Sequence, residues 1–266
     1  MATGKKNGLK AAFDIQPGEV ISLVGGGGKT TLMFALAREL MAQKGLVITT
    51  TTTKIFTPTL SDTPYVLVSA EENKIIDFIL KNGSRYGHIT IASEKIASSG
   101  KLIGINSELI ATLRILDPVT YIIVEADGAA QRPLKAPDTD YEPVIPQNSS
   151  LVIPVAGIDA LGCKLIEEHV FRSEIAAKLT GTAVGEIVST DTIATLMTKQ
   201  TGMIFGSPVD ARIIPFINKL DLKDSLTEAR DLASRIFGEK HPQIGRVVLG
   251  QAKFQPSVLE IVTKRM

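Results

Sequence analysis

Seven residues near the N-terminus have the types and spacing of a phosphate-binding loop: Gly25, Gly26, Gly27, Gly28, Lys29, Thr30 and Thr31. An apolar segment precedes them, and an amphipathic helical pattern follows. Glycines let backbone N–H groups approach phosphate oxygens, and a helix N-terminus adds the positive end of its dipole. Lys29 would then contact the β and γ phosphates of a nucleoside triphosphate, and the Thr30 hydroxyl would bind Mg²⁺. A plain glycine turn with an incidental lysine is the alternative, and the flanking strand and helix disfavour it.

The spacing of this loop departs from the common G-x-x-x-x-G-K-[ST] pattern, because Leu23 stands where the first glycine is usual. The compact G-x-x-G-K-T-T form resembles the short phosphate loop of Mur-type peptide ligases. That resemblance implies the same phosphate chemistry in a shorter loop.

Two carboxylates follow another apolar segment, in the order Val124, Glu125, Ala126, Asp127 and Gly128. A nucleotidase needs one carboxylate to hold Mg²⁺ and another group to orient the attacking water. We assign Glu125 to magnesium and Asp127 to the water or the γ phosphate, and the reverse assignment stays open. The alternative is that both acids only cap the end of a strand.

A run of five threonines, residues 49–53, precedes Lys54 directly after a predicted strand. Ligands of open α/β sheets gather at the carboxyl ends of strands, so Lys54 is expected near the nucleotide as a substrate or lid residue. Threonine also simply favours strands, which explains the run equally well.

The sequence Asn218-Lys219-Leu220-Asp221 matches the N-K-x-D signature with which many GTPases bind guanine. A carboxylate at Asp221 can accept two hydrogen bonds from the guanine base, and this bidentate geometry is selective. The match predicts GTP in preference to ATP. A simple turn at a strand end is the alternative.

Apolar segments separated by turn residues predict the buried strands of a scaffold for these groups, at residues 20–24, 46–49, 65–69, 88–92, 121–126, 151–156, 212–217 and 246–249. Helical patterns alternate with them, at residues 31–43, 71–81, 107–115, 173–179 and 225–237. This alternation predicts an α/β fold of the P-loop NTPase type, with a mainly parallel sheet and helices on both faces. We expect one domain over residues 1–266, with a helical subdomain around residues 160–206.

Residues 128–150 interrupt this alternation, because Pro133, Pro137, Pro143 and Pro146 forbid a continuous helix or central strand. Long irregular loops in compact domains usually have a function, so a lid or binding segment is expected. Arg132 and Lys135 could contact an anionic substrate there. The acidic side chains Asp138, Asp140 and Glu142 could bind a cation or only keep the loop soluble.

The composition excludes several classes of protein. Lysine and arginine (29) nearly balance aspartate and glutamate (28), which argues against binding to nucleic acid or to an anionic membrane. The single cysteine, Cys163, cannot form an intramolecular disulfide. No apolar run is long enough to span a membrane. We therefore expect a soluble, cytoplasmic protein.

Several motifs together resemble the YqeC family: G-G-G-G-K-T-T, T-T-T-K, V-E-A-D-G-A-A-Q-R-P-L-K-A-P with E-P-V-I-P after it, V-A-G-I-D-A-L-G and N-K-L-D. The similarity extends from about residue 18 to residue 250 and is most specific in residues 124–146. One departure is that Arg172 lacks the histidine and proline that the family leads us to expect beside it.

The resemblance implies a role in maturing selenium-dependent molybdenum hydroxylases, in which selenium is installed at the molybdenum cofactor. The implied partners are therefore the molybdenum cofactor or a selenium donor, and a client hydroxylase or another maturation protein. Kinship with metal-insertion GTPases of the SIMIBI class implies a homodimer around the nucleotide. Cys163 could carry a chalcogen as a thiolate, but its apolar neighbours favour a buried small side chain.

Three functions follow from these observations. The first is a Mg²⁺-dependent maturation factor that binds and hydrolyses GTP or ATP, with hydrolysis driving a conformational change. The second is a transferase that passes a phosphoryl, nucleotidyl or selenium group to a pterin cofactor. The third is a non-catalytic adaptor whose affinity for a partner is gated by nucleotide.

Overall fold

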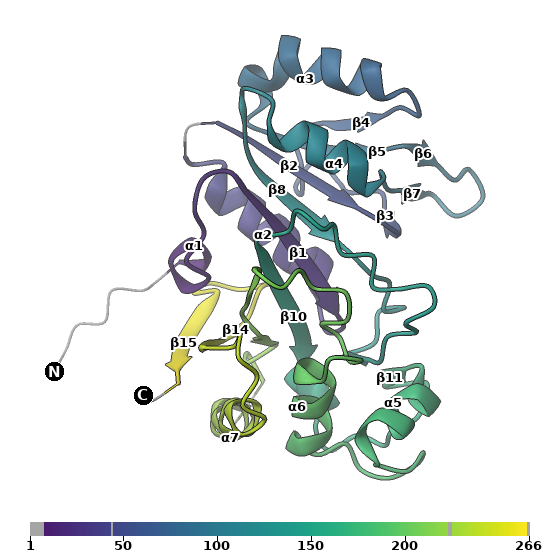
Figure 1. Ribbon diagram of the computed structural model, residues 1–266, viewed down its shortest axis with the longest axis vertical. Helices are drawn as coiled ribbons and strands as arrows, with labels where there is room; N and C mark the ends of the chain where they lie inside the picture. The colour runs from purple at the N-terminus through teal and green to yellow at the C-terminus, as the bar shows by residue number, and fades with distance from the viewer. Residues whose placement is uncertain (1–7, 44, 223–224, 265–266) are drawn as a thin grey trace, which may run out of the picture.

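A ten-stranded sheet forms the centre of the molecule in a computed structural model that describes residues 8–43, 45–222 and 225–264 (Figure 1). Its strand order is β15-β14-β13-β10-β1-β8-β2-β5-β4, and β12 pairs beside β10. The strands are β1 (Glu19–Gly25), β2 (Leu46–Thr51), β4 (Val66–Val68), β5 (His88–Ala92), β8 (Val119–Glu125), β10 (Leu151–Gly157), β12 (Arg212–Ile213), β13 (Phe216–Asn218), β14 (Arg246–Gly250) and β15 (Val258–Thr263). All pair in parallel except β15, which runs antiparallel to β14.

Helices cover both faces of this sheet, as the sequence predicts. They are α1 (Leu9–Ala12), α2 (Lys29–Leu40), α3 (Glu72–Tyr86), α4 (Ser107–Arg114), α5 (Ser173–Thr180), α6 (Thr190–Thr198) and α7 (Ser225–Gly238). Alternate residues of β1 point to opposite faces. Ile21 and Leu23 pack with α1 and α2, whereas Val20 packs with α3 and α4 on the other side. The α/β class with a mostly parallel sheet is therefore confirmed.

The predicted strand over residues 212–217 is divided into β12 and β13. Pro215 lies between the two strands and has no backbone N–H to contribute to the ladder. Its carbonyl still accepts a hydrogen bond from the N–H of Val248, at 2.9 Å. The break falls just before the segment that carries Asn218.

Two small sheets lie beside the large one. β3 (Lys54–Phe56), β7 (Lys101–Ile103) and β6 (Glu94–Lys95) form one, and β9 (Leu134–Lys135) and β11 (Val170–Phe171) form the other. Neither was predicted, because strands of two or three residues carry too few side chains to show a period. The strand β15 was missed as well, since Pro256 and Ser257 obscure where it begins.

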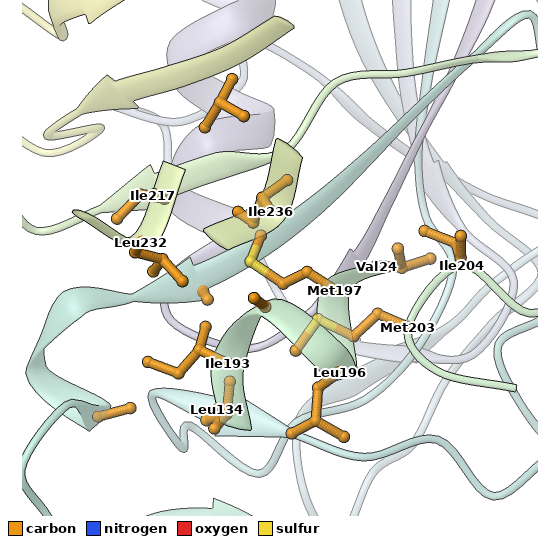
Figure 2. Close-up of a cluster of buried hydrophobic side chains, with 14 of the residues drawn as sticks. Val24, Leu134, Ile193, Leu196, Met197, Met203, Ile204, Ile217, Leu232 and Ile236 are labelled. Atoms are coloured by element: carbon orange, nitrogen blue, oxygen red, sulfur yellow. The ribbon is translucent and has the colours of Figure 1, made fainter. Parts of the chain in front are cut away.

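The helical region around residues 160–206 packs directly on the sheet. Ile193 and Met197 of α6 belong to the same hydrophobic cluster as Val24 of β1 and Leu232 of α7 (Figure 2). Within the described residues no helix has both the length and the apolar character needed to cross a membrane.

Candidate functional site

The glycine loop connects β1 to α2, and three of its N–H groups are held by the protein itself. Gly25 donates to Oδ2 of Asp127 at 3.0 Å, Gly26 donates to the carbonyl of Val155 at 2.9 Å, and Gly27 donates to the carbonyl of Arg132 at 2.9 Å. The first half of the loop is therefore fixed in shape by the ends of two strands and by the long loop.

The second half of the loop leaves its donors open. The N–H groups of Gly28, Lys29, Thr30 and Thr31 have no hydrogen-bond partner among the described residues, and no side chain caps α2. All four residues line a cavity of about 390 Å³. Four adjacent donors at a helix N-terminus that open into one cavity form a site for an anion.

Lys29 is buried beneath this cavity, with 4% of its surface exposed. Its Nζ donates to the carbonyl of Gly25 and lies 3.1 Å from Oδ1 of Asp127 and 3.7 Å from Oε1 of Glu125. Burial alone would lower the pKa of Lys29, but the charges of Asp127 and Glu125 outweigh it and raise this pKa above its usual range. Lys29 is therefore a fixed positive charge next to the open N–H groups.

Thr30 and Glu125 lie side by side on the lining of the same cavity. The Thr30 hydroxyl donates to Oε2 of Glu125 at 2.7 Å, and both residues line the cavity. Burial raises the pKa of Glu125, and the nearby charge of Lys29 opposes that shift. A hydroxyl and a carboxylate are the hard oxygen ligands that Mg²⁺ prefers, so the pair fits this ion.

The described part of the chain contains no group of three or more histidine, cysteine, aspartate or glutamate side chains that could hold a metal ion. Any Mg²⁺ at Thr30 and Glu125 would thus need most of its ligands from phosphate oxygens and water. That is the usual way in which Mg²⁺ binds with nucleotides.

Asp127 lies behind the loop and does not line the cavity. Only 1% of its surface is exposed, and its carboxylate binds the N–H of Gly25 and the amines of Lys29 and Lys135. The structure therefore separates the two acids of the sequence motif. Glu125 faces the cavity, and Asp127 holds Lys29 and the start of the loop in place.

A chain of buried charges continues from Asp127 into the long loop. Nζ of Lys135, fully buried, lies 3.0 Å from Oδ2 of Asp127 and 2.7 Å from Oε1 of Glu142. Glu142 also accepts from the N–H of Gly128 and pairs with Arg172 at 2.7 Å. The sequence placed Lys135 at a substrate, whereas here it joins the long loop to the glycine loop. Sequence reasoning missed that Glu142 pairs with Lys135 and with Arg172, because these residues lie 7 and 30 positions from Glu142.

Arg132 and Lys54, the other two predicted substrate residues, have different surroundings. The guanidinium of Arg132 donates to the carbonyl of Glu167 at 2.8 Å and does not line the cavity. Lys54 lies on the cavity wall, beside Phe56 and Lys101. Phe56 and Lys101 were not predicted, because their strands are too short to be recognised.

The N-K-L-D segment lies on the other side of the glycine loop. Asn218 is 4% exposed; its amide donates to the carbonyl of Gly27 at 2.8 Å and accepts from the N–H of Ala252 at 2.8 Å. Asn218 is thus a support for the glycine loop. Lys219, with a φ of 67°, pairs with Asp159 at 2.6 Å.

Asp221 is exposed and lines a second cavity of about 340 Å³, together with Phe254. The glycine-loop residues Gly28 and Thr31 line that cavity as well. The anion site is therefore adjacent to a hollow that contains a carboxylate and an aromatic ring.

Cys163 lies apart from both cavities and is half-buried. Its thiol donates to the carbonyl of Asp159 at 3.2 Å. Burial and the charge of Asp159 raise the pKa of this thiol, which disfavours the thiolate that carrier chemistry would need.

Comparison with known proteins identifies relatives of the chain. The family model described as YqeC protein matches residues 21–174, more than half of the chain. The chain is also 31% identical over 245 residues to a protein of Escherichia coli (strain K12) named "Uncharacterized protein YqeC", an alignment that covers 90% of each chain. The matched region includes the glycine loop, both acids and the whole long loop.

Proposed function

We propose that this chain, which belongs to the YqeC family, is a Mg²⁺-dependent nucleotide triphosphatase that acts in the maturation of another protein. The observation that carries the proposal is the cavity at the start of α2. There, the four open N–H groups, the amine of Lys29 and the Thr30–Glu125 pair converge on one space. Each is a group that a magnesium-bound triphosphate requires.

The proposed roles follow from the position of each side chain. The N–H groups of residues 28–31 bind phosphate oxygens, and Lys29 supplies positive charge to the β and γ phosphates. Thr30 and Glu125 would hold Mg²⁺, which supplies further neutralisation of the phosphates. Since Glu125 is the carboxylate that faces the cavity, we assign it also the orientation of the attacking water. Asp127 acts as a positioning residue for Lys29.

The choice of base is proposed to rest on Asp221. Its carboxylate and the ring of Phe254 line the hollow next to the glycine loop. A carboxylate that accepts from the guanine N1 and N2 groups would favour GTP over ATP. Asn218 and Lys219 contribute indirectly, because they hold the loop and the turn before Asp221.

The wider role is proposed from the family resemblance: installation of selenium at the molybdenum cofactor of a client hydroxylase, with hydrolysis driving a conformational change and two copies pairing around nucleotide. The buried charge chain from Lys29 to Arg172 supports the conformational part, because a phosphate at Lys29 would alter the charge balance along it. A transferase acting on a pterin cofactor and a nucleotide-gated adaptor remain as alternatives to hydrolysis.

One experiment separates these three functions. The purified protein is incubated with Mg²⁺ and GTP or ATP, with and without molybdenum cofactor, and the products are analysed for free phosphate and for a modified acceptor. Phosphate release without an acceptor supports the proposal, whereas turnover that requires the acceptor supports the transferase. Binding without turnover supports the adaptor. If no nucleotide binds at millimolar concentration, the proposal is wrong.

A further inference from the structure

Two lysines on one wall of the main cavity have no role in the proposed chemistry. Lys54 and Lys101 line the same cavity as the glycine loop, and Phe56 lines it with them. Neither lysine is paired with a carboxylate among the eleven ion pairs that the described residues form. Their charge is therefore available to a ligand.

The small sheet β3-β7-β6 presents these side chains on one face. In β3, Lys54 and Phe56 are exposed whereas Ile55 between them is buried, so the first two point the same way. Phe56 is directly opposite Lys101 in the antiparallel pair. The amine of Lys101 lies over the Phe56 ring, 4.8 Å from its centre, and this cation–π contact holds the lysine against the wall.

This wall is fixed to the end of the strand that carries the catalytic acid. The hydroxyl of Thr51 donates to the carbonyl of Glu125 at 2.6 Å, three residues before Lys54. On the other side, β7 continues to Gly104, whose N–H donates to the carbonyl of Thr53 at 3.1 Å. A Cβ on Gly104 would lie 1.6 Å from the carbonyl oxygen of Thr51, so only glycine allows the two backbone segments to lie this close together. The lysines are thus on a rigid support.

The charges lining the cavity are strongly unbalanced. Four lysines line it (Lys29, Lys54, Lys101 and Lys219), and Glu125 is the one carboxylate among the described lining residues. Lys29 is already shared with Glu125 and Asp127, and Lys219 pairs with Asp159. The excess positive charge lies on Lys54 and Lys101.

Backbone strain marks the rim formed by the start of the long loop. Ala130 and Gln131 both line the cavity, and both have a left-handed backbone, with φ of 45° and 61°. Consecutive non-glycine residues in this region are costly and tend to occur where function requires the shape. The cavity therefore extends beyond the glycine loop as a formed space between β3, β7 and residues 128–131.

We propose that Lys54 and Lys101 form a second anion subsite in the main cavity, which binds a phosphate or carboxylate group of a second substrate next to the nucleotide phosphates. This inference rests on the proposed nucleotide site and names the substrate class that shares it: a small anion-bearing molecule. Phe56 is the positioning residue, because it holds the amine of Lys101. With this subsite, the cavity binds two ligands side by side: the nucleotide and the second substrate.

The test uses the full-length protein saturated with Mg²⁺ and a non-hydrolysable GTP or ATP analogue, so that the glycine loop is filled. Inorganic phosphate and, separately, acetate are then titrated by calorimetry into wild type, Lys54→Gln, Lys101→Gln and the double variant. The matched control is Lys95→Gln, an exposed lysine on β6 of the same small sheet that does not line the cavity. Nucleotide affinity is measured for every variant.

We expect wild type and the control to bind phosphate, acetate or both. The double variant should bind the anion at least about tenfold more weakly while its nucleotide affinity stays within about threefold, since one lost lysine–anion contact corresponds to about that factor. Phe56→Leu should weaken anion binding in the same direction as Lys101→Gln, because the lysine loses its support.

Two results would overturn the subsite. One is an equal loss of nucleotide affinity in the lysine variants, which would make Lys54 and Lys101 part of the triphosphate site. The other is anion binding that the variants do not change, or none in wild type. If no nucleotide binds, the proposed function fails by itself, and the titrations are repeated without nucleotide. Anion binding that then depends on Lys54 and Lys101 but not on Lys29 would still support the subsite.

Discussion

The amine of Lys135 lies 3.0 Å from Oδ2 of Asp127, and neither side chain is more than 1% exposed to solvent. This pair joins the proline-rich loop to the glycine loop, because Asp127 also accepts from the N–H of Gly25 and contacts Lys29. A buried charge is tolerated only when it is paired, so each member of the chain depends on the next. The relationship gives the long loop a structural role that its sequence does not reveal.

Replacement of Lys135 by methionine should destabilise the protein strongly. The change leaves Asp127 and Glu142 buried without their shared cation, and breaking such a pair costs about 3–5 kcal/mol. Chemical denaturation measures the free energy of unfolding. Lys74→Met is the matched control, since Lys74 is 68% exposed and its pairing with Glu71 is worth about 1 kcal/mol at most. Equal losses of unfolding free energy in the two variants would show that the buried charges contribute no more to stability than an exposed ion pair does.

Replacement of Glu125 by glutamine should affect the thermal stability of the protein and its affinity for nucleotide differently. Burial raises the pKa of Glu125 above the ordinary value of 4.5, so the folded state holds this proton more tightly than the unfolded state. The contribution of the Glu125 carboxyl to the free energy of unfolding is complete below pH 4.5. It is lost as pH rises through the pKa that Glu125 has in the folded state, so at pH 7 the buried, ionised carboxylate destabilises the protein. The glutamine variant removes this cost but also removes the Glu125 charge that raises the pKa of Lys29, so its unfolding temperature at pH 7 should change little.

The same Glu125→Gln variant should bind Mg²⁺-nucleotide at least about tenfold more weakly, because a ligand of the ion is lost. Fluorescence titration with a labelled nucleotide measures this, and Glu94→Gln on exposed β6 serves as control. Lower thermal stability combined with unchanged nucleotide affinity would contradict both the burial argument and the magnesium assignment.

Alanine at Gly27 should disrupt the glycine loop. Its φ is 69°, and a Cβ would lie 2.0 Å from the backbone nitrogen of Gly157. Gly100 has nearly the same φ, 66°, but nothing within 4 Å of its Cβ position, so Gly100→Ala isolates the cost of the conformation, about 1 kcal/mol. We expect Gly27→Ala to lose more stability than that and to lose nucleotide binding. If the two alanine variants behave alike, the loop has room to adjust.

Asparagine at Asp221 should change the choice of base. A charged hydrogen bond contributes about 1.5–3 kcal/mol, so GTP affinity should fall at least about tenfold, while xanthosine triphosphate should gain. Competition binding with GTP, ATP and xanthosine triphosphate measures the change. The control is Asp210→Asn, an exposed acid outside this hollow. Unchanged GTP affinity would remove Asp221 as the guanine reader.

Acid should destabilise the protein through His88. Burial, with the charge of Arg38, lowers the pKa of His88 from 6.5 to about 4, so the folded state favours the neutral ring. The neutral ring of His88 stabilises the folded state above pH 6.5. This stabilisation, up to about 3 kcal/mol in total, is lost as pH falls towards 4. Wild type should therefore lose that much more unfolding free energy than His88→Phe between pH 7 and pH 4. Parallel pH dependences would assign the acid sensitivity to other groups.

Much of this protein is determined by its local sequence. The eight predicted strands and five predicted helices correspond to observed elements, because a buried strand or an amphipathic helix is recorded in the period of its own apolar residues. The same holds for the glycine loop, whose composition, flanking strand and following helix are contiguous. Glu125 and Thr30 were assigned to one ion from their types and their places in two local motifs, and in the structure these two side chains are joined by a hydrogen bond of 2.7 Å.

Only the tertiary structure decides which of the predicted residues line the same cavity. Glu125 is the last residue of β8 and Asp127 follows two residues later, but only Glu125 lines the cavity. Lys135 is a charged residue in a proline-rich loop, and nothing in that pattern shows that it is fully buried and paired with Asp127 and Glu142. Lys101 reaches the cavity through a three-residue strand. Contacts between distant segments depend on how the chain packs, and no short stretch of sequence records that packing.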